Sequence, residues 1–267
     1  MKERLKQMLA AMHISPNADA AFYEFGLHKE KHYDVLVVAP GWKPTKIIDR
    51  QDIEVVCTME HSYISGYELT VQGLSIAWIQ SSSGAGSLID EIITCAELHF
   101  DKLVFMGAVG ALTADIGLGE LCTPEWCIAG NLANGYLEED LTKYIPFQKV
   151  FPNDKQFVDQ VMALSKDMGI PMRKEPVFCT DSIFCEYSHL DFIRSFGAKL
   201  IEMETSSFYL MAGLLEKPAI ALLAVSDNSA TGDPLIARTP EQKIMYNRCR
   251  EEVIPEMLIR IAKLPVS

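Results

Sequence analysis

The chain has 267 residues, about half of them hydrophobic (49%), and a formal net charge of −12. This length and composition allow one large α/β domain with a full core, so we expect residues 1–267 to form a single domain. An acidic chain without a basic block binds nucleic-acid phosphates poorly, which favours small-molecule partners. The N-terminus is charged and leads into no apolar stretch of membrane-spanning length, so we expect a cytoplasmic protein that does not enter membranes.

The seven cysteines are scattered along the chain without the paired spacing of a metal site. Their odd number argues against a disulfide framework, so most are expected to be buried thiols in a reducing compartment. No metal site is predicted.

Apolar runs and turn residues predict alternating strands and helices. Residues 1–30 form an amphipathic lead-in, in which residues 15–17 break an early helix. The expected strands are 34–39, 54–58, 62–71, 74–80, 103–106, 122–129, 177–180 and 219–225. The expected helices are 19–26, 88–98, 153–168, 189–196 and 240–262, the last interrupted at Pro255, and residues 131–152 are interpreted as a loop over the site.

The run from Ala219 to Val225 contains only apolar residues. Such a strand is typical of the centre of a parallel sheet that is covered on both faces. Residues 54–71 show alternation instead, with Gly66 among them, and indicate antiparallel strands. An α/β fold is therefore expected.

Small or polar residues cluster where four of the predicted strands end. They are Gly41, Gly84 to Gly86, Gly107 to Gly110, and Ser226 with Asp227. Ligands of open α/β sheets bind at the carboxyl ends of the strands, and glycine permits close approach to the backbone. A dinucleotide-binding turn at Gly84 is weakly supported, because Ile89 occupies the position of its third glycine, so an NAD-dependent oxidoreductase is a minor alternative.

The order of these motifs resembles the nucleoside phosphorylase superfamily, which includes purine nucleoside and uridine phosphorylases and methylthioadenosine/adenosylhomocysteine nucleosidases. The resemblance spans roughly residues 34–262. It rests on Pro-Gly-x-x-Pro from Pro40, Ser-Gly-x-Gly from Ser83, Gly-Ala-Val-Gly-Ala from Gly107, and above all Glu-Met-Glu (202–204) followed by Ser226-Asp227.

This resemblance implies a three-layer α/β/α fold with a central mixed β-sheet, of the phosphorylase/hydrolase-like type. It implies an enzyme that cleaves the N-glycosidic bond of a ribonucleoside, more of the purine than of the pyrimidine type. Inorganic phosphate is the possible co-substrate, and no other cofactor is implied. A homo-oligomer, either a dimer or a hexamer, is expected.

By the same resemblance Asp227 is the general acid that protonates the purine ring, and Glu204 binds the ribose hydroxyls. An acid in this role needs a raised pKa, from burial or from the neighbouring Glu202 and Glu204. The expected nucleoside-binding residues are Glu202, Met203, Glu204, Phe184, Val109, Gly110 and Ser226.

Simpler interpretations remain open for several of these residues. Glu202 and Glu204 are also placed to stabilise a helix N-terminus through its dipole. Either Phe184 or Phe178 is a candidate to stack on the base, and a core role suits both equally. His13 and His28 are candidates to reach the site of a neighbouring subunit, although surface positions suit them better.

The phosphate half of the site departs from the family pattern. The resemblance implies arginines in the first glycine loop, before the Gly-Ser/Thr-x-Gly motif and from a partner subunit, but this chain has Thr45 or Lys46, Phe105 and Glu60 at these places. Ala108 replaces the phosphate-contacting serine. The remaining candidates for an anion site are Gly41, Lys43, Lys46, Gly84, Ala85, Gly107 and Ala108, with Arg50 nearby. Arg238 and Lys243 are candidates for the arginine that assists the acid.

Three functions are therefore open. Phosphorolysis is favoured by the majority of the family, and hydrolysis by the missing arginines, because a bidentate guanidinium is not easily replaced. A nucleoside- or base-binding protein without catalysis is the third.

Overall fold

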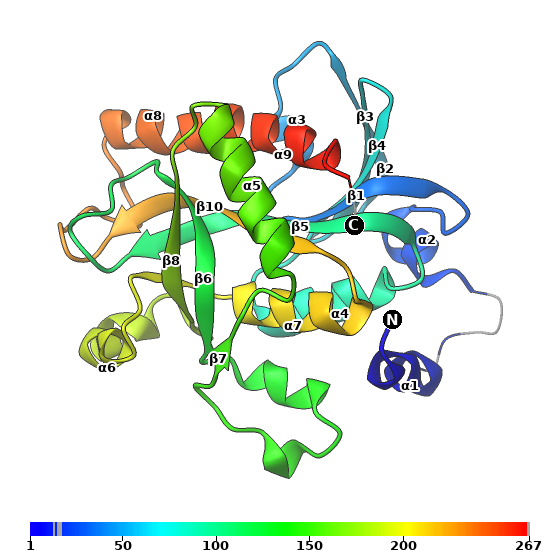
Figure 1. The fold of residues 1–267 in the computed structure, drawn as a ribbon, viewed down its shortest axis with the longest axis horizontal. Coiled ribbons are helices and arrows are strands. Elements are labelled where there is room, and N and C mark those ends of the chain that lie inside the picture. Colours follow the sequence, from blue (N-terminus) through cyan, green and yellow to red (C-terminus); the bar gives the residue numbers. More distant parts are fainter. Residues whose placement is uncertain (13, 15–17, 266–267) are drawn as a thin grey trace.

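Ten strands form one mixed β-sheet in the computed structural model, which describes residues 1–12, 14 and 18–265 (Figure 1). The strands are β1 (His32–Val38), β2 (Ile53–Glu60), β3 (Ser65–Val71), β4 (Leu74–Gln80), β5 (His99–Ala111), β6 (Leu121–Ala129), β7 (Lys149–Val150), β8 (Met172–Cys179), β9 (Leu200–Glu202) and β10 (Ala219–Asn228). The helices are α1 (Glu3–Ala11), α2 (Ala20–Phe25), α3 (Pro44–Ile47), α4 (Ala85–Thr94), α5 (Lys155–Asp167), α6 (Leu190–Ser195), α7 (Thr205–Leu215), α8 (Pro240–Arg248) and α9 (Ile254–Ala262). Short 3₁₀ turns η1 (Leu132–Leu137), η2 (Leu141–Lys143) and η3 (Cys185–His189) and a π-helical turn η4 (Cys249–Val253) complete the described elements.

The strand order is β10-β6-β8-β9-β5-β1-β4-β3-β2, with β7 on the edge of β6. Because β10 also pairs with β5, the strands β5, β9, β8, β6 and β10 close into a ring. Pairing is parallel within the group β4, β1, β5 and β10 and antiparallel in β2, β3 and β4. The expectation of an α/β fold with a central mixed sheet is confirmed.

Helices cover the sheet on both sides. In Figure 1, α3, α5, α8 and α9 lie on one side of the sheet, and α4 and α7 lie on the other.

Every residue of β10 is buried, and successive side chains of the strand enter different clusters. Ala221 and Leu223 pack with α4 and α7, whereas Ile220 and Leu222 pack with α5 and α9. The apolar run from Ala219 to Val225 is therefore a strand without a solvent-facing side, as its sequence predicts.

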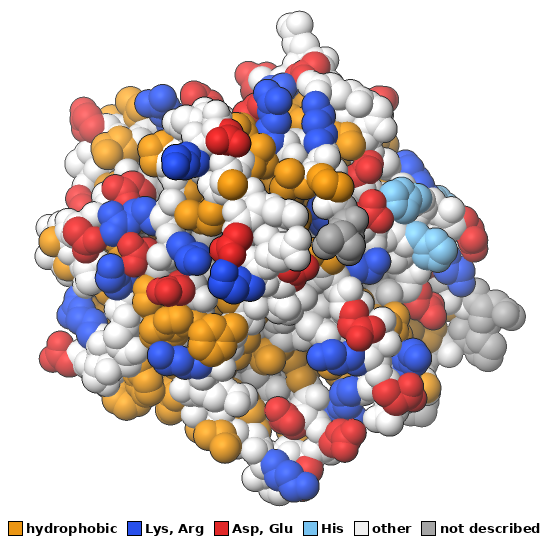
Figure 2. Space-filling model, viewed as in Figure 1, with side chains coloured by type: hydrophobic (Ala, Val, Ile, Leu, Met, Phe, Trp, Pro, Cys, Tyr) orange, Lys and Arg blue, Asp and Glu red, His pale blue; other side chains and the backbone are white. Residues whose placement is uncertain are grey.

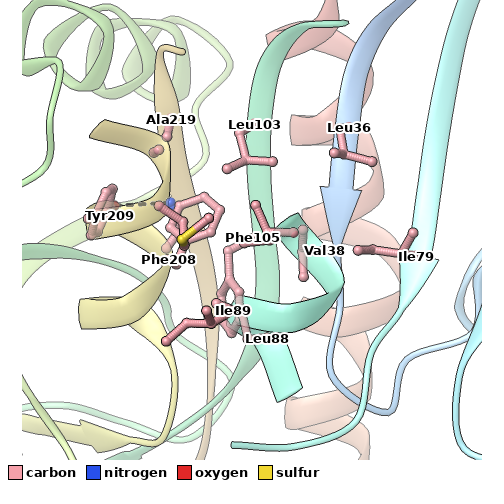
Figure 3. Close-up of a cluster of buried hydrophobic side chains, with 14 of the residues drawn as sticks. Leu36, Val38, Ile79, Leu88, Ile89, Leu103, Phe105, Phe208, Tyr209 and Ala219 are labelled. Carbon is pink, nitrogen blue, oxygen red and sulfur yellow. Dashed lines mark hydrogen bonds between the residues drawn. The ribbon is translucent and has the colours of Figure 1, made fainter. Parts of the chain in front are cut away.

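Aromatic and aliphatic side chains fill the layer between the sheet and α4 and α7. Figure 3 shows Leu103 and Phe105 of β5 facing Phe208 of α7, with Leu88 and Ile89 of α4 below them. The rings of Phe105 and Phe208 have centroids 5.5 Å apart. This packing holds the N-termini of α4 and α7 close to the ends of the central strands.

Local sequence signals explain several element boundaries. Gln72 and Gly73 both have positive φ, 51° and 81°, which is the two-residue turn that matches the twist of the β3–β4 hairpin. Asp19 caps α2 through the Phe22 amide, and Thr239 caps α8 in a capping box with Gln242.

The helix that follows Thr239 does not stop at Pro255. A π-helical turn precedes this proline, which occupies the first turn of α9, where it has no amide hydrogen bond to lose.

Two central strands, β5 and β10, continue past their predicted ends. Residues 107–111 extend β5 to Ala111, because they pair with β10 and β9 rather than form a loop. Likewise β10 continues to Asn228, with an irregularity in its pairing between Val225 and Asp227. Asp227 therefore lies within a strand and not after one.

The N-terminal region is described only in part. The predicted helix break at residues 15–17 falls outside the described residues, as does His13. In the part of the chain that is described, no helix has the length and apolar character needed to span a bilayer. On the face shown in Figure 2, acidic and basic side chains are interspersed.

Candidate active site

A pocket opens where β5, β9 and β10 end. Its walls come from segments that are far apart in the chain: the loops after β1 and β4, the η3 region, the loop after β10 and the strand ends themselves. The lining residues are Pro40, Trp42, Ser83, Phe105, Gly107, Ala108, Val109, Gly110, Ile183, Glu186, Ile201, Glu202, Met203, Glu204, Ser226, Asp227 and Leu235. Of the candidates from the sequence, this set contains Asp227, Ser226, Glu202, Met203, Glu204, Val109, Gly110, Gly107 and Ala108.

Asp227 projects into the pocket from the irregular end of β10 and is 6% exposed. The Ser226 hydroxyl donates a hydrogen bond of 2.6 Å to Asp227 Oδ1. A side chain at Gly110 of β5 would place its Cβ 3.0 Å from Asp227 Oδ2, so glycine there leaves room for the carboxyl group. Burial raises the pKa of Asp227, while the Ser226 hydrogen bond and the Arg238 charge oppose the rise. Burial, and not repulsion by Glu202 or Glu204, is thus the cause of this raised pKa.

Arg238 is the cation that lies beside this acid. Its Nε donates a hydrogen bond of 2.6 Å to the Ser226 carbonyl, and its guanidinium packs over the Tyr246 ring with 4.8 Å between the guanidinium carbon and the ring centroid. Of the two candidates from the sequence, Arg238 is the one whose charge acts on Asp227.

Glu202 is engaged by its own protein on both carboxyl oxygens. Oε2 accepts hydrogen bonds from the amides of Glu204 (2.7 Å) and Thr205 (2.9 Å) at the start of α7. Oε1 accepts from the Thr205 hydroxyl (2.8 Å) and the Cys179 thiol (2.9 Å). Glu202 therefore has the contacts of a carboxylate that stabilises the N-terminus of α7. It also lines the pocket.

Glu204 is differently placed, because its carboxyl group accepts a hydrogen bond from the described residues on one oxygen. Its Oε1 accepts a hydrogen bond of 2.6 Å from the Gly84 amide at the start of α4. No described residue is hydrogen-bonded to Oε2. Burial, reinforced by the charge of Glu202, raises the pKa of Glu204 to about 8. Glu204 thus ties the Ser81–Gly84 loop to α7 through one of its two carboxyl oxygens.

The expected anion site is not assembled around this pocket. Gly41, Lys43, Lys46, Gly84 and Ala85 are absent from its lining, which among the described residues contains no lysine, arginine or histidine. The Gly41 amide bonds to the Ser81 carbonyl, and the Gly84 amide is taken by Glu204.

The nearby cations are occupied elsewhere. Lys43 pairs with Glu60, with 2.6 Å between Nζ and Oε1. Arg50 pairs with Asp52 and Glu256, and Lys46 is exposed. Of the predicted anion-binding set, only Gly107 and Ala108 line the pocket.

The aromatic candidates for base stacking do not line the pocket. Phe184 is 69% exposed, and Phe178 is buried among Phe147 and Phe196 in a separate cluster. The same loop instead contributes Ile183 and Glu186 to the lining. His28 lies on the surface against Phe22.

Residues 131–152 do not cover the pocket, contrary to the expectation from the sequence. They contain η1, η2 and β7, and none of them lines the pocket. Arg4 of α1 donates hydrogen bonds to the carbonyls of Leu137 and Glu138. The Asn131 side chain donates a hydrogen bond of 3.2 Å to the Met203 carbonyl and so helps to hold the backbone of the Glu-Met-Glu segment.

Several lining residues had no signal in the sequence. Glu186 belongs to no motif, and Leu235 lies in a loop after β10 without periodicity. Trp42 and Ser83 belong to the glycine motifs that begin at Pro40 and Ser83, although neither was named as a site residue. Phe105 was singled out as the replacement of an arginine, and it lines the pocket at that place.

Comparison with known proteins places this site in a family. The sequence pattern of the phosphorylase superfamily matches residues 56–253. The chain belongs to the phosphorylase superfamily. The resemblance derived from its motifs is thereby confirmed.

Known members of the phosphorylase superfamily resemble the chain at low identity. The DeoD-type purine nucleoside phosphorylase of Bacillus subtilis is 24% identical over 189 residues, which cover 68% of this chain and 76% of that protein. The corresponding enzyme of Streptococcus gordonii is 25% identical over 182 residues, covering 66% and 72%. Among solved structures, the 5′-methylthioadenosine/S-adenosyl homocysteine nucleosidase of Campylobacter jejuni superposes with a TM-score of 0.65, covering 86% of this chain and 99% of that one. At 16% identity this last likeness concerns the fold.

Proposed function

We propose that this protein cleaves the N-glycosidic bond of a purine-type ribonucleoside, with Asp227 as the general acid and Glu204 as the ribose ligand. The observation that carries the proposal is the convergence of these two carboxyl groups, from β10 and from the start of α7, on one pocket. As the bond breaks, the ribose gains oxocarbenium character and the base accumulates negative charge. Protonation of the leaving base by Asp227 neutralises that charge, and the free oxygen of Glu204 accepts hydrogen bonds from the ribose hydroxyls.

We further infer that the attacking group is water rather than phosphate. The pocket lining offers the carboxyl groups of Glu186, Glu202, Glu204 and Asp227 and, within the described part of the chain, no cationic side chain. Such surroundings give a phosphate dianion no cationic partner, and those carboxyl groups that are ionised stabilise the positive charge of an oxocarbenium-like transition state. In this reaction water adds to C1′ and releases one proton to solvent, the base leaves with the proton of Asp227, and Asp227 then takes up a proton from solvent.

Phosphorolysis is the second candidate, supported by the names of the DeoD-type relatives. Binding without catalysis is the third, supported by the same lack of phosphate-binding arginines. A cytoplasmic location, a homo-oligomer, the three-layer α/β/α arrangement and a reaction without a metal belong to the proposal as well.

The test is base release from adenosine, inosine and uridine, in phosphate-free buffer and with added phosphate. We expect release of a purine base at a rate that phosphate does not change, with ribose as the sugar product. Release that requires phosphate and yields ribose 1-phosphate contradicts hydrolysis. Binding of a nucleoside in a thermal-shift assay without any base release contradicts both reactions.

A further inference from the structure

Glu186 is a buried acid of the pocket to which the proposed reaction gives no role. Its side chain lines the pocket, and the residue is only 8% exposed. Its backbone amide bonds to the Ser182 carbonyl, but its carboxyl group receives no hydrogen bond from any residue that the structure describes. The carboxyl oxygens of Glu186 are not among the enclosed polar atoms that lack a partner, so they are open to the pocket, where a ligand can supply a hydrogen-bond partner.

Glu186 and the general acid Asp227 line the same pocket, and the charge of Asp227 acts on Glu186. Burial raises the pKa of Glu186 to about 8, and the charges of Asp227 and Glu202 add to the rise. The pKa of the neighbouring Tyr187 is raised by burial and by the charges of Asp227 and Glu186. The groups that face Glu186 are thus Asp227 from β10, Glu202 from β9 and Tyr187 from η3, with Arg238 acting on Asp227 from the following loop. A base that is protonated by Asp227 in this pocket is therefore within reach of Glu186 as well.

The chemistry of purines determines what Glu186 meets. Ring nitrogen N7 and the substituent on C6 lie on one edge of a purine, and this substituent is an amino donor in adenine and an oxygen acceptor in guanine and hypoxanthine. When Asp227 contacts N7, a carboxyl group beside Asp227 is next to the C6 substituent. An ionised carboxylate only accepts hydrogen bonds, whereas a protonated carboxyl group also donates one.

We propose that Glu186 determines specificity at C6 of the base and, when ionised, selects 6-aminopurine over 6-oxopurine ribonucleosides. The proposal rests on the proposed function, because it takes the orientation of the base from Asp227. The ionised form pairs with the amino group and repels a 6-oxo oxygen. The protonated form tolerates both, since its hydroxyl donates to the oxygen. Selectivity for the amino substrate must then increase as Glu186 ionises.

The experiment measures kcat/KM for adenosine and inosine from pH 6 to pH 9 with the wild-type protein and with Glu186→Gln. Changes in the protonation of Asp227 and Glu204 affect both substrates and cancel in the ratio of the two constants. We expect the adenosine-to-inosine ratio of the wild type to rise on the order of tenfold over this range. Glu186→Gln keeps the size of the side chain and does not titrate, so its ratio should change much less. Any titration of the substrates is common to both proteins.

Asp191→Asn, a change at a fully exposed acid of α6, is the matched control and should retain the wild-type rise. A wild-type ratio that is independent of pH overturns the proposal even if Glu186→Gln does not fold. So does a Glu186→Gln ratio that rises as steeply as that of the wild type.

A binding experiment separates this proposal from the proposed function. Calorimetry with adenine and hypoxanthine needs no turnover, and we expect the preference for adenine to increase with pH in the wild type and not in Glu186→Gln. If the protein cleaves no nucleoside but shows this preference, the proposed function fails and the role of Glu186 stands. Equal affinity for the two bases at pH 9 overturns the role of Glu186, whatever reaction is catalysed.

Discussion

Asp227 has the surroundings that a general acid requires. It is nearly enclosed, its pKa is raised by burial, and Ser226 fixes the orientation of its carboxyl group through a 2.6 Å hydrogen bond. Arg238 lies behind Ser226 and counters part of this rise in pKa, which keeps the acid able to release its proton. The proton transfer thus depends on one carboxyl group whose environment is supplied by two neighbours.

Replacing Asp227 by asparagine should abolish this transfer, because an amide has no acidic proton to donate. We expect kcat for nucleoside cleavage to fall by about 10² to 10⁴, with a small effect on KM, since asparagine fills the same space. The measurement is steady-state kinetics, with circular dichroism to verify the fold and the exposed Asp191→Asn as control. An unchanged kcat would remove Asp227 from the role of acid.

Strand β3 passes very close to the end of α2 at Gly66. A Cβ atom at Gly66 would lie 1.8 Å from the Phe25 carbonyl oxygen. The Thr58 hydroxyl of β2 also bonds to this carbonyl. The β2–β3 hairpin therefore packs directly against the end of α2 at Gly66, where no larger residue fits.

Gly66→Ala should lower the free energy of unfolding by about 3 kcal/mol or more, because backbone atoms must move to admit the methyl group. The matched control is Gly213→Ala within α7, where the nearest atom to the new Cβ is 3.8 Å away. There we expect a gain of about 0.5 to 1 kcal/mol from the lower entropy of the unfolded chain. Urea unfolding of both variants tests the contrast, and similar values for the two would contradict it.

The whole molecule carries a set of buried acids with raised pKa values. Those of Glu186 and Glu204 are raised to about 8, and that of Glu91 to about 7, in each case mainly by burial. Glu91 Oε1 accepts the Ser82 amide at 3.1 Å, while its Oε2 has no partner among the described residues. The folded state thus binds more protons than the unfolded state at neutral pH. Stability that these groups contribute below about pH 4.5 is lost as the pH rises through 7 to 8.

We accordingly expect the free energy of unfolding to decrease between pH 5 and pH 8. Glu91→Gln keeps an acceptor for the Ser82 amide without the charge, so it should be more stable than the wild type at pH 8 by up to about 3 kcal/mol. The advantage should vanish near pH 4.5. Chemical denaturation at several pH values measures it, with the exposed Glu97→Gln as control. A constant difference between Glu91→Gln and wild type at all pH values would refute this origin of the pH dependence.

Much of the fold was predictable from short-range patterns. The apolar run of β10 and the alternation of β3 each depend on residues next to one another in the chain, and both segments are strands, as expected. The same holds for the pairing of Glu204 with Asp227, because residues at the ends of strands that share a sheet must lie near one another. Local periodicity and strand-end chemistry are properties that a sequence displays directly.

Contacts between distant segments were not predictable in this way. The glycines of residues 107–111 indicate a loop, yet they continue β5 because β9 and β10 supply hydrogen-bond partners. Lys43, Arg50 and the Gly84 amide suggest an anion site until their partners Glu60, Glu256 and Glu204 are located. Glu186 lines the pocket because the segment between β8 and α6 folds back over the strand ends. Whether a charged or polar group is free for a ligand depends on its neighbours in space, which local sequence does not encode.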